Sequence, residues 1–421
     1  NHKIRKIVIS TGVVTTLAGS GSSGSADDTG TSASFNGPRG ITIDGSNLYV
    51  ADTANHKIRK ISLIGNVNAG VALHNLDDEI NVSVSLASSD TGEATVSPAT
   101  LTFTGNNWNT AQTVTVSGVN DNDRDKHQDY KISLSSADQF TDNLEVTTLA
   151  GSGTAGSTNG TGTASSFKDP TAATIVGNNL YVADSKNHTI RKIVISTGVV
   201  STFAGSPGSQ GSTNAAGTSA RFRNPWGITN DGTNLYVADT DNHLIRKIVI
   251  STGVVTTIAG SPGSAGSTDG TGTSARFTYP RGITTDGTNL YVVDSLGHKI
   301  RKIVISTGVV TTLAGSNNGF ADGTGTAAKF SYPNGITTDG TNLYVGDDNN
   351  HRIRKIVIST GAVTTLAGSG SSGSADGTGT AARFKNSRGI TTDGTNLYVG
   401  DYGNHKIRKI VISTGVVTTL A

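Results

Sequence analysis

The chain consists largely of short runs in which apolar residues alternate with polar ones. Typical runs read GITTDG, NLYVADT, HKIRKIVIST and GVVTTLAG, and they are rich in Ile, Val, Thr and Tyr. Asp-Gly, Asn and Thr-Gly turn signals separate the runs, as expected for antiparallel strands joined by tight turns. No run keeps helical spacing over about ten residues, so the pattern predicts an all-β fold.

The same four runs recur with a nearly constant period. The phrase NHKIRKIVISTGVVTTLAG, or a close variant, recurs every 53–55 residues, except for one interval of 132 residues. Four strands per period make one propeller blade, and the long interval indicates an insertion. Each copy of the phrase carries one histidine: His2, His56, His188, His243, His298, His351 and His405.

The tandem signature P-x-G-I-T-x-D-G-x-N-L-Y-V-x-D-x-x-N-H-x-I-R-K resembles that of NHL-repeat β-propellers. The resemblance covers about four fifths of the chain and implies a six-bladed propeller with four-stranded antiparallel blades. Blade 2 departs from it, because PTAATIVGNN lacks the Gly after the Pro-x pair and has Val176 in place of the turn Asp. Blade 6 has Ser387 where Pro is expected. Neither change threatens the expected fold.

The first two strands of the repeat occur six times and the last two occur seven times, so one outer hairpin is surplus. Residues 1–18 are identical to residues 404–421. A surplus hairpin presents an open strand edge and apolar side chains that require a cover. We consider three ways in which the hairpin could be covered. Upstream strands of a longer protein could pack on it, a neighbouring copy of the chain could do so, or the hairpin could form part of an incomplete seventh blade. The apolar residues of the hairpin are Ile4, Ile7, Ile9, Val13, Val14 and Leu17.

Residues 62–145 share nothing with the repeat and interrupt blade 1. The predicted organisation is therefore propeller at 1–61, insertion at 62–145 and propeller again at 146–421. Period-two alternation in INVSVSLASS, ATVSPATLTFT and AQTVTVSGV predicts a small β-sandwich. SPATLTFTGNNWNTAQTVTVSGVNDN resembles a Calx-beta-like or cadherin-like module, a kind common in secreted bacterial adhesins.

The insertion is acidic and the propeller is basic, which favours self-association at low salt. Within the insertion, clustered carboxylates offer the hard oxygen ligands that Ca²⁺ prefers, with a plain acidic turn as the alternative. These candidate calcium ligands are Asp121, Asp123, Asp125 and Asp129.

The composition excludes several classes of protein. With no Cys, the chain has no disulfide scaffold, no Cys-ligated zinc and no thiol nucleophile. No apolar run approaches the roughly 18 residues of a membrane span, so we expect no membrane insertion. The sequence begins at Asn1 without Met or a leader; we expect a processed or partial chain, located outside the cell or at its surface.

Three kinds of polar residue recur once per blade, and each has a structural interpretation. We expect the aspartates to satisfy turn amides, the histidines to bond from blade to blade rather than hold a catalytic metal, and the Arg-Lys pairs to form a solvated rim rather than bind nucleic acid. The two aspartate columns are Asp44, Asp231, Asp286, Asp339 and Asp393, then Asp52, Asp184, Asp239, Asp294, Asp347 and Asp401. The pairs begin at Arg59, Arg191, Arg246, Arg301, Arg354 and Arg408.

The blades differ most at the residue after the repeat Pro, which enters the innermost strand near the central channel. A mixture of Arg, Trp and Asn around one opening is typical of a site for an anionic or carbohydrate ligand. The ligand-binding rim predicted here comprises Arg39, Trp226, Arg281, Asn334 and Arg388, with Thr171 at the same position of blade 2.

Nearly equal blades favour a non-catalytic structural or interaction protein, because an enzyme must break its symmetry to build one active site. We therefore expect a scaffold without a cofactor, apart from the candidate Ca²⁺, that assembles with copies of itself head to tail through the surplus hairpin into an extracellular filament or array. The alternatives are an adhesin or receptor that binds a glycan or peptide and, third, an NHL-like lyase or lactonase.

Overall fold

The computed structural model describes residues 4–7, 14–18, 22–29, 32–43, 47–62, 82–88, 94–103, 115–118, 132–136 and 145–419, except 393 and 405. The chain divides into two compact units. One contains residues 1–63 and 144–421, and the other contains residues 64–143. The described helices are single turns of three residues, none of them able to cross a membrane.

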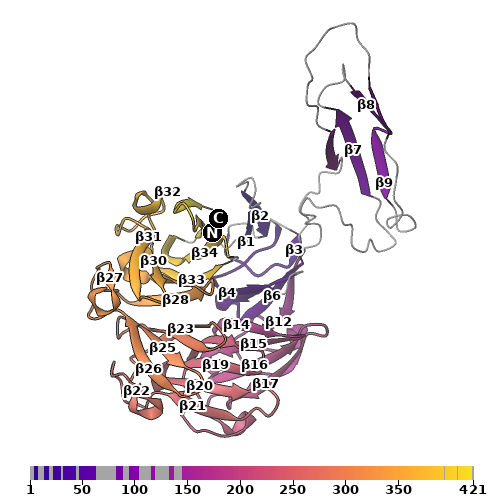
Figure 1. Cartoon of the computed structure of the whole chain (residues 1–421). Coiled ribbons are helices and arrows are strands. Elements are labelled where there is room, and N and C mark those ends of the chain that lie inside the picture. The colour runs from indigo at the N-terminus through magenta and orange to yellow at the C-terminus, as the bar shows by residue number, and fades with distance from the viewer. Residues whose placement is uncertain are drawn as a thin grey trace. The chain divides into compact units, whose positions relative to one another are not determined.

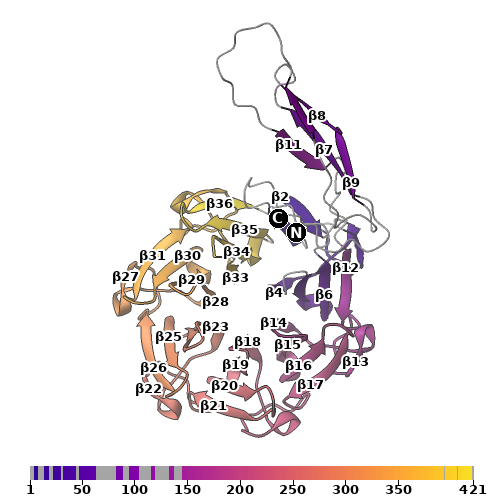
Figure 2. The same ribbon diagram turned by 45° about the vertical axis from the view of Figure 1, so that its right-hand side comes forward.

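The larger unit is an all-β propeller of six blades (Figure 1). In Figure 2 the innermost strands of the six blades surround a common centre. The innermost strands are β4 (Pro38–Ile43), β14 (Pro170–Val176), β18 (Pro225–Asn230), β23 (Pro280–Thr285), β28 (Pro333–Thr338) and β33 (Ser387–Thr392). The second strands are β5 (Asn47–Asp52), β15 (Asn179–Asp184), β19 (Asn234–Asp239), β24 (Asn289–Asp294), β29 (Asn342–Asp347) and β34 (Asn396–Asp401).

The third and fourth strands form the outer hairpin of each blade. The third strands are β6 (Lys57–Ser62), β16 (Thr189–Val194), β20 (Leu244–Val249), β25 (Lys299–Val304), β30 (Arg352–Val357) and β35 (Lys406–Val411). The fourth strands are β12 (Glu145–Ala150), β17 (Val199–Ala204), β21 (Val255–Ala259), β26 (Val309–Ala314), β31 (Ala362–Ala367) and β36 (Val416–Thr419). Because β6 pairs with β12, the insertion enters the third hairpin connection of blade 1.

Five blades carry a fifth strand, so the expectation of four strands per blade is wrong for them. Each fifth strand has two residues and pairs antiparallel with the outermost strand, which shortens the exposed sheet edge. Two residues are too few to show alternation in a sequence. These strands are β3 (Asp28–Thr29), β13 (Gly160–Thr161), β22 (Gly270–Thr271), β27 (Gly323–Thr324) and β32 (Gly377–Thr378).

Short 3-10 turns occur at two places in the repeat. One set follows the second strands, and the other set lies between the outer strands of one blade and the inner strand of the next. Those after the second strands are η2 (Thr53–Asn55), η4 (Ser185–Asn187), η6 (Thr240–Asn242), η9 (Asp348–Asn350) and η11 (Tyr402–Asn404). Those before the next inner strand are η3 (Gly162–Ala164), η5 (Gly217–Ser219), η7 (Gly272–Ser274), η8 (Gly325–Ala327) and η10 (Gly379–Ala381).

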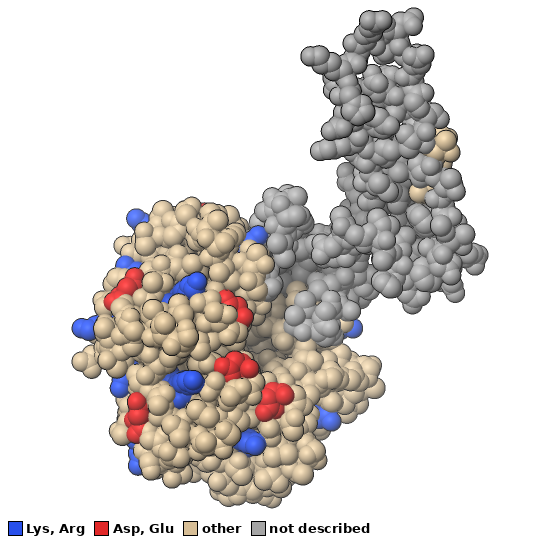
Figure 3. Space-filling view, viewed as in Figure 1, with Lys and Arg blue, Asp and Glu red and all other residues tan. Residues whose placement is uncertain are grey.

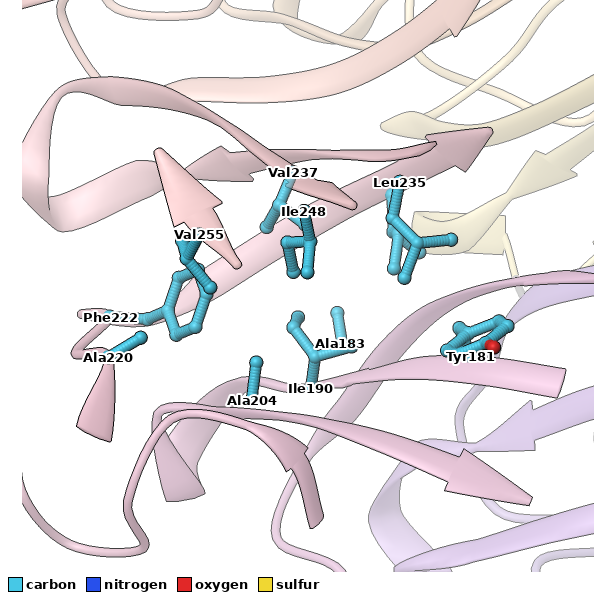
Figure 4. Close-up of a cluster of buried hydrophobic side chains, with 11 residues drawn as sticks. Tyr181, Ala183, Ile190, Ala204, Ala220, Phe222, Leu235, Val237, Ile248 and Val255 are labelled. Carbon is cyan, nitrogen blue, oxygen red and sulfur yellow. The ribbon is translucent and has the colours of Figure 1, made fainter. Parts of the chain in front are cut away.

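The hydrophobic core lies between neighbouring blades. Tyr181 and Ile190 of blade 2 pack against Phe222, Leu235 and Ile248 of blade 3 (Figure 4), and equivalent clusters lie between later blades. The second strands are buried on both faces, which explains their almost uninterrupted apolar sequence LYVA. Burial of each large aliphatic side chain contributes roughly 1.5–3 kcal/mol.

The C-terminal hairpin completes blade 6, because β36 pairs with β35. The N-terminal hairpin has no place in a blade: β1 (Ile4–Ile7) and β2 (Val14–Ala18) form a two-stranded sheet, and the described residues offer them no other strand. Residues Ile9 and Val13 lie outside the described part. The surplus hairpin is thus at residues 1–18.

The smaller unit contains two antiparallel sheets. One pairs β8 (Ala94–Ser97) with β10 (Thr115–Gly118), and the other has the order β11 (Ile132–Ser136), β7 (Val82–Ser88), β9 (Thr100–Phe103). The β-sandwich and the Calx-beta-like resemblance stay predictions. The candidate calcium ligands Asp121, Asp123, Asp125 and Asp129 lie outside the described residues.

Gly346 and Gly400 provide a matched pair for testing how closely adjacent blades approach. They occupy the same repeat position, which holds Ala51 in blade 1. A Cβ at Gly346 would clash with the carbonyl oxygen of Ser387, whereas a Cβ at Gly400 would find its nearest neighbours at 3.6 Å.

We therefore expect Gly346→Ala to lower the free energy of unfolding by about 1–3 kcal/mol, as overpacking does. Gly400→Ala should leave it unchanged or raise it slightly, since Ala loses less backbone entropy than Gly on folding. Chemical denaturation of both variants measures the difference. Equal effects of the two substitutions would contradict this packing of blades 5 and 6.

Candidate functional site

A buried ion pair occurs in every blade. The aspartate that ends the second strand pairs with the arginine seven residues later, with Nη1 to Oδ2 distances of 2.8–3.1 Å. Both side chains of each pair are completely buried. The pairs are Asp52–Arg59, Asp184–Arg191, Asp239–Arg246, Asp294–Arg301, Asp347–Arg354 and Asp401–Arg408.

In blade 3 the carboxylate of Asp239 is satisfied from several sides. Oδ1 accepts the backbone N–H of Arg223 at 2.7 Å, and Oδ2 accepts Nδ2 of Asn242 at 2.8 Å as well as Nη1 of Arg246. Burial raises the pKa of Asp239 to about 6, while Arg246 and these hydrogen bonds oppose the rise. The carboxylate thus links the outer hairpin to the segment that precedes the inner strand.

The guanidinium group of Arg246 also makes several hydrogen bonds. Nη1 donates to the carbonyl of Arg221 at 2.9 Å, and Nη2 donates to the carbonyl of Thr213 and to Oδ1 of Asn214. Its Cζ lies 5.1 Å from the ring centroid of Phe222, the repeated Phe of the blade. Such stacking is a favourable cation–π contact.

The interpretation of the repeated arginines as a solvated rim is wrong. Strand alternation turns Arg into the blade interface and leaves Lys60, Lys192 and Lys247 half-buried on the other face. The sequence did carry a signal, namely the constant spacing of seven residues from Asp to Arg. The second aspartate column is correspondingly a set of ion-pair partners, beyond the expected turn role.

Blade 4 shows how the network tolerates a substitution. Gly297 replaces the Asn that elsewhere donates to the Asp carboxylate and to a glycine carbonyl. Thr278 Oγ1 donates to the carbonyl of Gly266 instead, at 3.0 Å. The carbonyl oxygen of Gly266 therefore still accepts a side-chain hydrogen bond.

The first aspartate column has the expected role in turns. Asp231 Oδ1 accepts the backbone N–H groups of Thr233 and Asn234, and Oδ2 accepts the hydroxyl of Tyr236 at 2.7 Å. The same bonds occur at Asp286 and Asp339. Asp44 and Asp393 lie outside the described residues.

The histidines bond from blade to blade, as expected. Nδ1 of His243 accepts the backbone N–H of Tyr279 in the next blade at 3.2 Å, and His56, His188 and His298 make the same bond. Each of these histidines is in the left-handed conformation. Among the described residues, Nδ1 of His351 has no hydrogen-bond partner. His405 lies outside them.

The unequal residues of the rim lie where the inner strands of adjacent blades approach each other closely. Each follows the repeat Pro or Ser and precedes a Gly in all blades but the second. A Cβ at Gly227 would clash with the carbonyl oxygen of Arg281 in the next blade. The missing Cβ thus lets the inner strands converge and brings the rim side chains together.

Trp226 is the centre of the rim. Cζ of Arg39 lies 5.4 Å from the centroid of its ring and Cζ of Arg281 lies 5.1 Å from it. These three side chains, with Thr171, line a hollow of about 350 Å³. The remaining lining residues are Asp169, Ser185, Lys186, Asn224, Thr240, Asp241 and Tyr279.

Arg388 and Asn334 belong to a neighbouring part of the rim and do not line the hollow. Cζ of Arg388 lies 3.8 Å from the ring centroid of Tyr402, and its Nε is 3.8 Å from Oδ2 of the buried Asp348. Tyr402 also lies 5.8 Å from Arg39. Sequence analysis missed Tyr402 and Asp348, whose equivalents in blades 1–4 are Thr or Ser.

The rim is locally rich in positive charge. Burial lowers the pKa of Arg281, and the guanidinium groups of Arg388 and Arg39 lower it further, against the carboxylates of Asp348 and Asp241. Elsewhere charges of both signs are interspersed on the visible face of the propeller (Figure 3). Within the described residues, no group of three or more His, Asp or Glu side chains has the arrangement of a metal site.

Comparisons with known proteins agree with the repeat signature. The family model described as NHL repeat matches residues 35–61. The chain is 30% identical over 295 residues to NHL repeat-containing protein 2 of Homo sapiens. This match covers 61% of this chain and 40% of the human protein. It is 31% identical over 257 residues to the Arabidopsis thaliana protein SUPPRESSOR OF QUENCHING 1, chloroplastic, covering 56% of this chain and 24% of that protein.

The chain spans less than half the length of these relatives. Among solved structures, an auxiliary nutrient binding protein from Bacteroides thetaiotaomicron has a similar fold, with a TM-score of 0.56 at 14% identity. The match covers 96% of this chain and 74% of that one. Together these findings confirm the expected resemblance to NHL-repeat proteins and the propeller fold.

The inter-blade histidine bonds make stability depend on pH. Burial lowers the pKa of His243, and Arg223 lowers it further while Asp241 opposes. Below the unfolded value of about 6.5, the unfolded chain binds a proton that the folded chain excludes. The stability contributed by this imidazole is therefore complete above that value and is lost as the pH falls.

We expect the His243→Asn variant to have a lower Tm than the wild type, and we expect this difference in Tm to be larger at pH 8 than at pH 5.5. Asn keeps the preference for the left-handed conformation, so the comparison isolates the imidazole. His351→Asn is the matched control, because Nδ1 of His351 accepts no hydrogen bond from the part of the chain that the structure describes. A Tm difference for His243→Asn that is constant or larger at low pH would contradict the assignment.

Proposed function

We propose that this propeller is a non-catalytic interaction module that binds its ligand at the hollow formed by Arg39, Trp226 and Arg281. One observation carries the proposal: the recurring Asp and Arg residues and four of the recurring His residues are used in structural bonds. Four of the six residues that differ between blades, by contrast, gather around the hollow, namely Arg39, Thr171, Trp226 and Arg281. Binding sites need such local asymmetry, and a pocket of this volume is at the lower end for small ligands.

The same distribution argues against a lyase or lactonase. A general base or nucleophile needs a partner within hydrogen-bonding reach and freedom to act on a substrate. The repeated Asp side chains are bound by Arg or by turn amides, and Nδ1 of four histidines accepts a backbone N–H. The repeated residues therefore serve the fold, and an enzymatic role is the less favoured alternative.

Self-assembly is a second candidate, favoured by the surplus hairpin. The β1–β2 hairpin lies outside the six blades in the described structure, and its sequence equals that of the hairpin that completes blade 6. An open hairpin edge is a template for strand addition by a second copy. The opposite charges of insertion and propeller would favour such head-to-tail contact at low salt.

An extracellular or cell-surface location and a filament or array stay parts of this second proposal.

We also propose a calcium site at Asp121, Asp123, Asp125 and Asp129, and Ca²⁺ is the one cofactor that we propose. Heat release on titration with millimolar Ca²⁺, absent in a chain with these four residues changed to Asn, is the result expected for that site.

The binding proposal is tested with peptide and glycan arrays. We expect ligands retained by the wild-type chain to lose at least about tenfold in affinity in the double variant Trp226→Ala/Arg281→Ala, because both anchors of the hollow are removed. The matched control is Leu296→Ala/Arg276→Ala, which removes an exposed apolar side chain and a positive charge from the same blade as Arg281. Unchanged array signals in the first variant would refute the proposal.

The assembly proposal is tested by light scattering of the full chain and of a chain lacking residues 1–18. We expect the full chain to show a mass that rises with concentration and falls with added salt. The shortened chain should stay monomeric under the same conditions. Monomers of both chains at all concentrations, or equal assembly of both, would contradict a role of the hairpin.

A further inference from the structure

Among the described residues, no carboxylate forms a close ion pair with either guanidinium group of the hollow. Within the described part of the chain, neither Arg39 nor Arg281 has a carboxylate within 4 Å or a side-chain hydrogen bond. Every arginine of the repeated column has both. Both side chains are half-buried. A partly desolvated charge without a close ion pair is unfavourable, so a counter-ion from outside the chain would stabilise both.

We propose that the hollow binds a small oxyanion, a carboxylate or phosphate group, between the guanidinium groups of Arg39 and Arg281. The inference rests on the binding role proposed above and names the chemistry of its ligand. Arginine presents parallel N–H donors whose geometry matches these groups, and such charge-assisted bonds are stronger than neutral ones.

The other polar groups lining the hollow are largely occupied. Thr171 Oγ1 donates to the carbonyl of Trp226 at 2.8 Å, Ser185 donates to the carbonyl of Pro225, and Thr240 donates to the carbonyl of Pro280 at 2.6 Å. These bonds join neighbouring blades, so they are part of the ring. The exposed ammonium group of Lys186 and the two guanidinium groups are left as donors, and the guanidinium groups are the ones that lie at the ring of Trp226.

The acidic residues of the lining also have partners. Asp241 accepts the side-chain amide of Asn224, and Asp169 lies 3.7 Å from the imidazole of His56. The third arginine of the rim, Arg388, faces Asp348. Neither partner cancels the negative charge of its carboxylate, because Asn224 is neutral and Nδ1 of His56 accepts the backbone N–H of Asp169. The cations Arg39, Lys186 and Arg281 still outnumber the two lining aspartates. Burial is the main cause of the lowered pKa of Arg281, and the like charges of Arg388 and Arg39 add to it.

Trp226 favours an anion over a neutral sugar. An indole ring binds a sugar through its open face, but this ring already has two guanidinium partners at 5.1 and 5.4 Å. The ring holds both cations in place, which reduces the entropy lost when they close on an anion. A neutral glycan would leave both charges without a counter-ion.

Trp226 also provides the readout. The chain has two tryptophans, so Trp108→Phe leaves Trp226 as the only indole next to the hollow. Its fluorescence and its indole N–H resonance are titrated with inorganic phosphate and with succinate at constant ionic strength. Glucose serves as the neutral probe, and calorimetry on the unmodified chain provides the same measurement if Trp108→Phe does not fold.

We expect a saturable response to phosphate or succinate and none to glucose. The anion that saturates at the lower concentration identifies the source, phosphate or carboxylate. Arg39→Gln and Arg281→Gln should each weaken binding about tenfold or more. Arg276→Gln is the control for net charge, since Arg276 lies in the same blade and bonds only nearby carbonyls among the described residues; it should change binding less than about twofold.

The absence of saturable anion binding, or binding that survives both substitutions, would overturn the inference. If array ligands still depend on Trp226 and Arg281 but neither anion competes with them, the anion chemistry is wrong and the binding role stands. If no array ligand depends on these residues, the binding role itself fails. Anion binding that depends on Arg39 and Arg281 supports both.

Discussion

The buried Asp–Arg pair is the interaction on which each blade depends. Removing two charges from water carries a penalty of several kcal/mol per ion, which is offset only by near-ideal geometry and by further hydrogen bonds. The blade supplies these from all its parts: the amide after the repeated Phe, an Asn in the 3-10 turn, carbonyls of the loop that precedes the Phe, and the Phe ring. A single pair therefore constrains residues spread over most of one repeat.

This constraint explains where the blades are equal and where they are free to differ. Loss of either charged partner leaves a buried charge unpaired, so the two columns repeat almost without change. The neutral Asn is less constrained, because blade 4 has Gly297 there and Thr278 replaces only its bond to the glycine carbonyl. Among the described residues, the side chain after the repeat Pro or Ser has no hydrogen bond to the pair and belongs to none of the hydrophobic clusters between blades. Arg, Thr, Trp and Asn are all accommodated there, and a ligand site can form without cost to the fold.

Much of the fold could be predicted from the sequence because its signals are local and repeated. Alternation, turn residues and the period define the strands, the six blades, the site of the insertion and the role of the histidines. The burial of Arg246 and its equivalents could not be deduced from polarity, since an Arg-Lys pair on a strand places one residue on each face. The two-residue fifth strands are too short to alternate.

The candidate site was predictable in position but not in composition. Variation among the rim residues pointed to the channel, and Arg39, Trp226 and Arg281 do come together there. Tyr402 and Asp348 reach the rim from the turn after the second strand, a position that holds Thr or Ser in other blades. Nothing local to these two residues indicates the arginines that they contact, because those contacts arise only when the ring brings the blades together.

A double-mutant cycle on Asp239 and Arg246 measures how strongly blade stability depends on this ion pair. The free energy of unfolding is measured for wild type, Asp239→Asn, Arg246→Met and the double variant. Each single substitution should cost about 3–5 kcal/mol, and the double variant should cost clearly less than their sum, because the second change removes the unpaired charge left by the first. Single losses below about 0.5 kcal/mol, as for surface substitutions, or strictly additive losses would contradict the account.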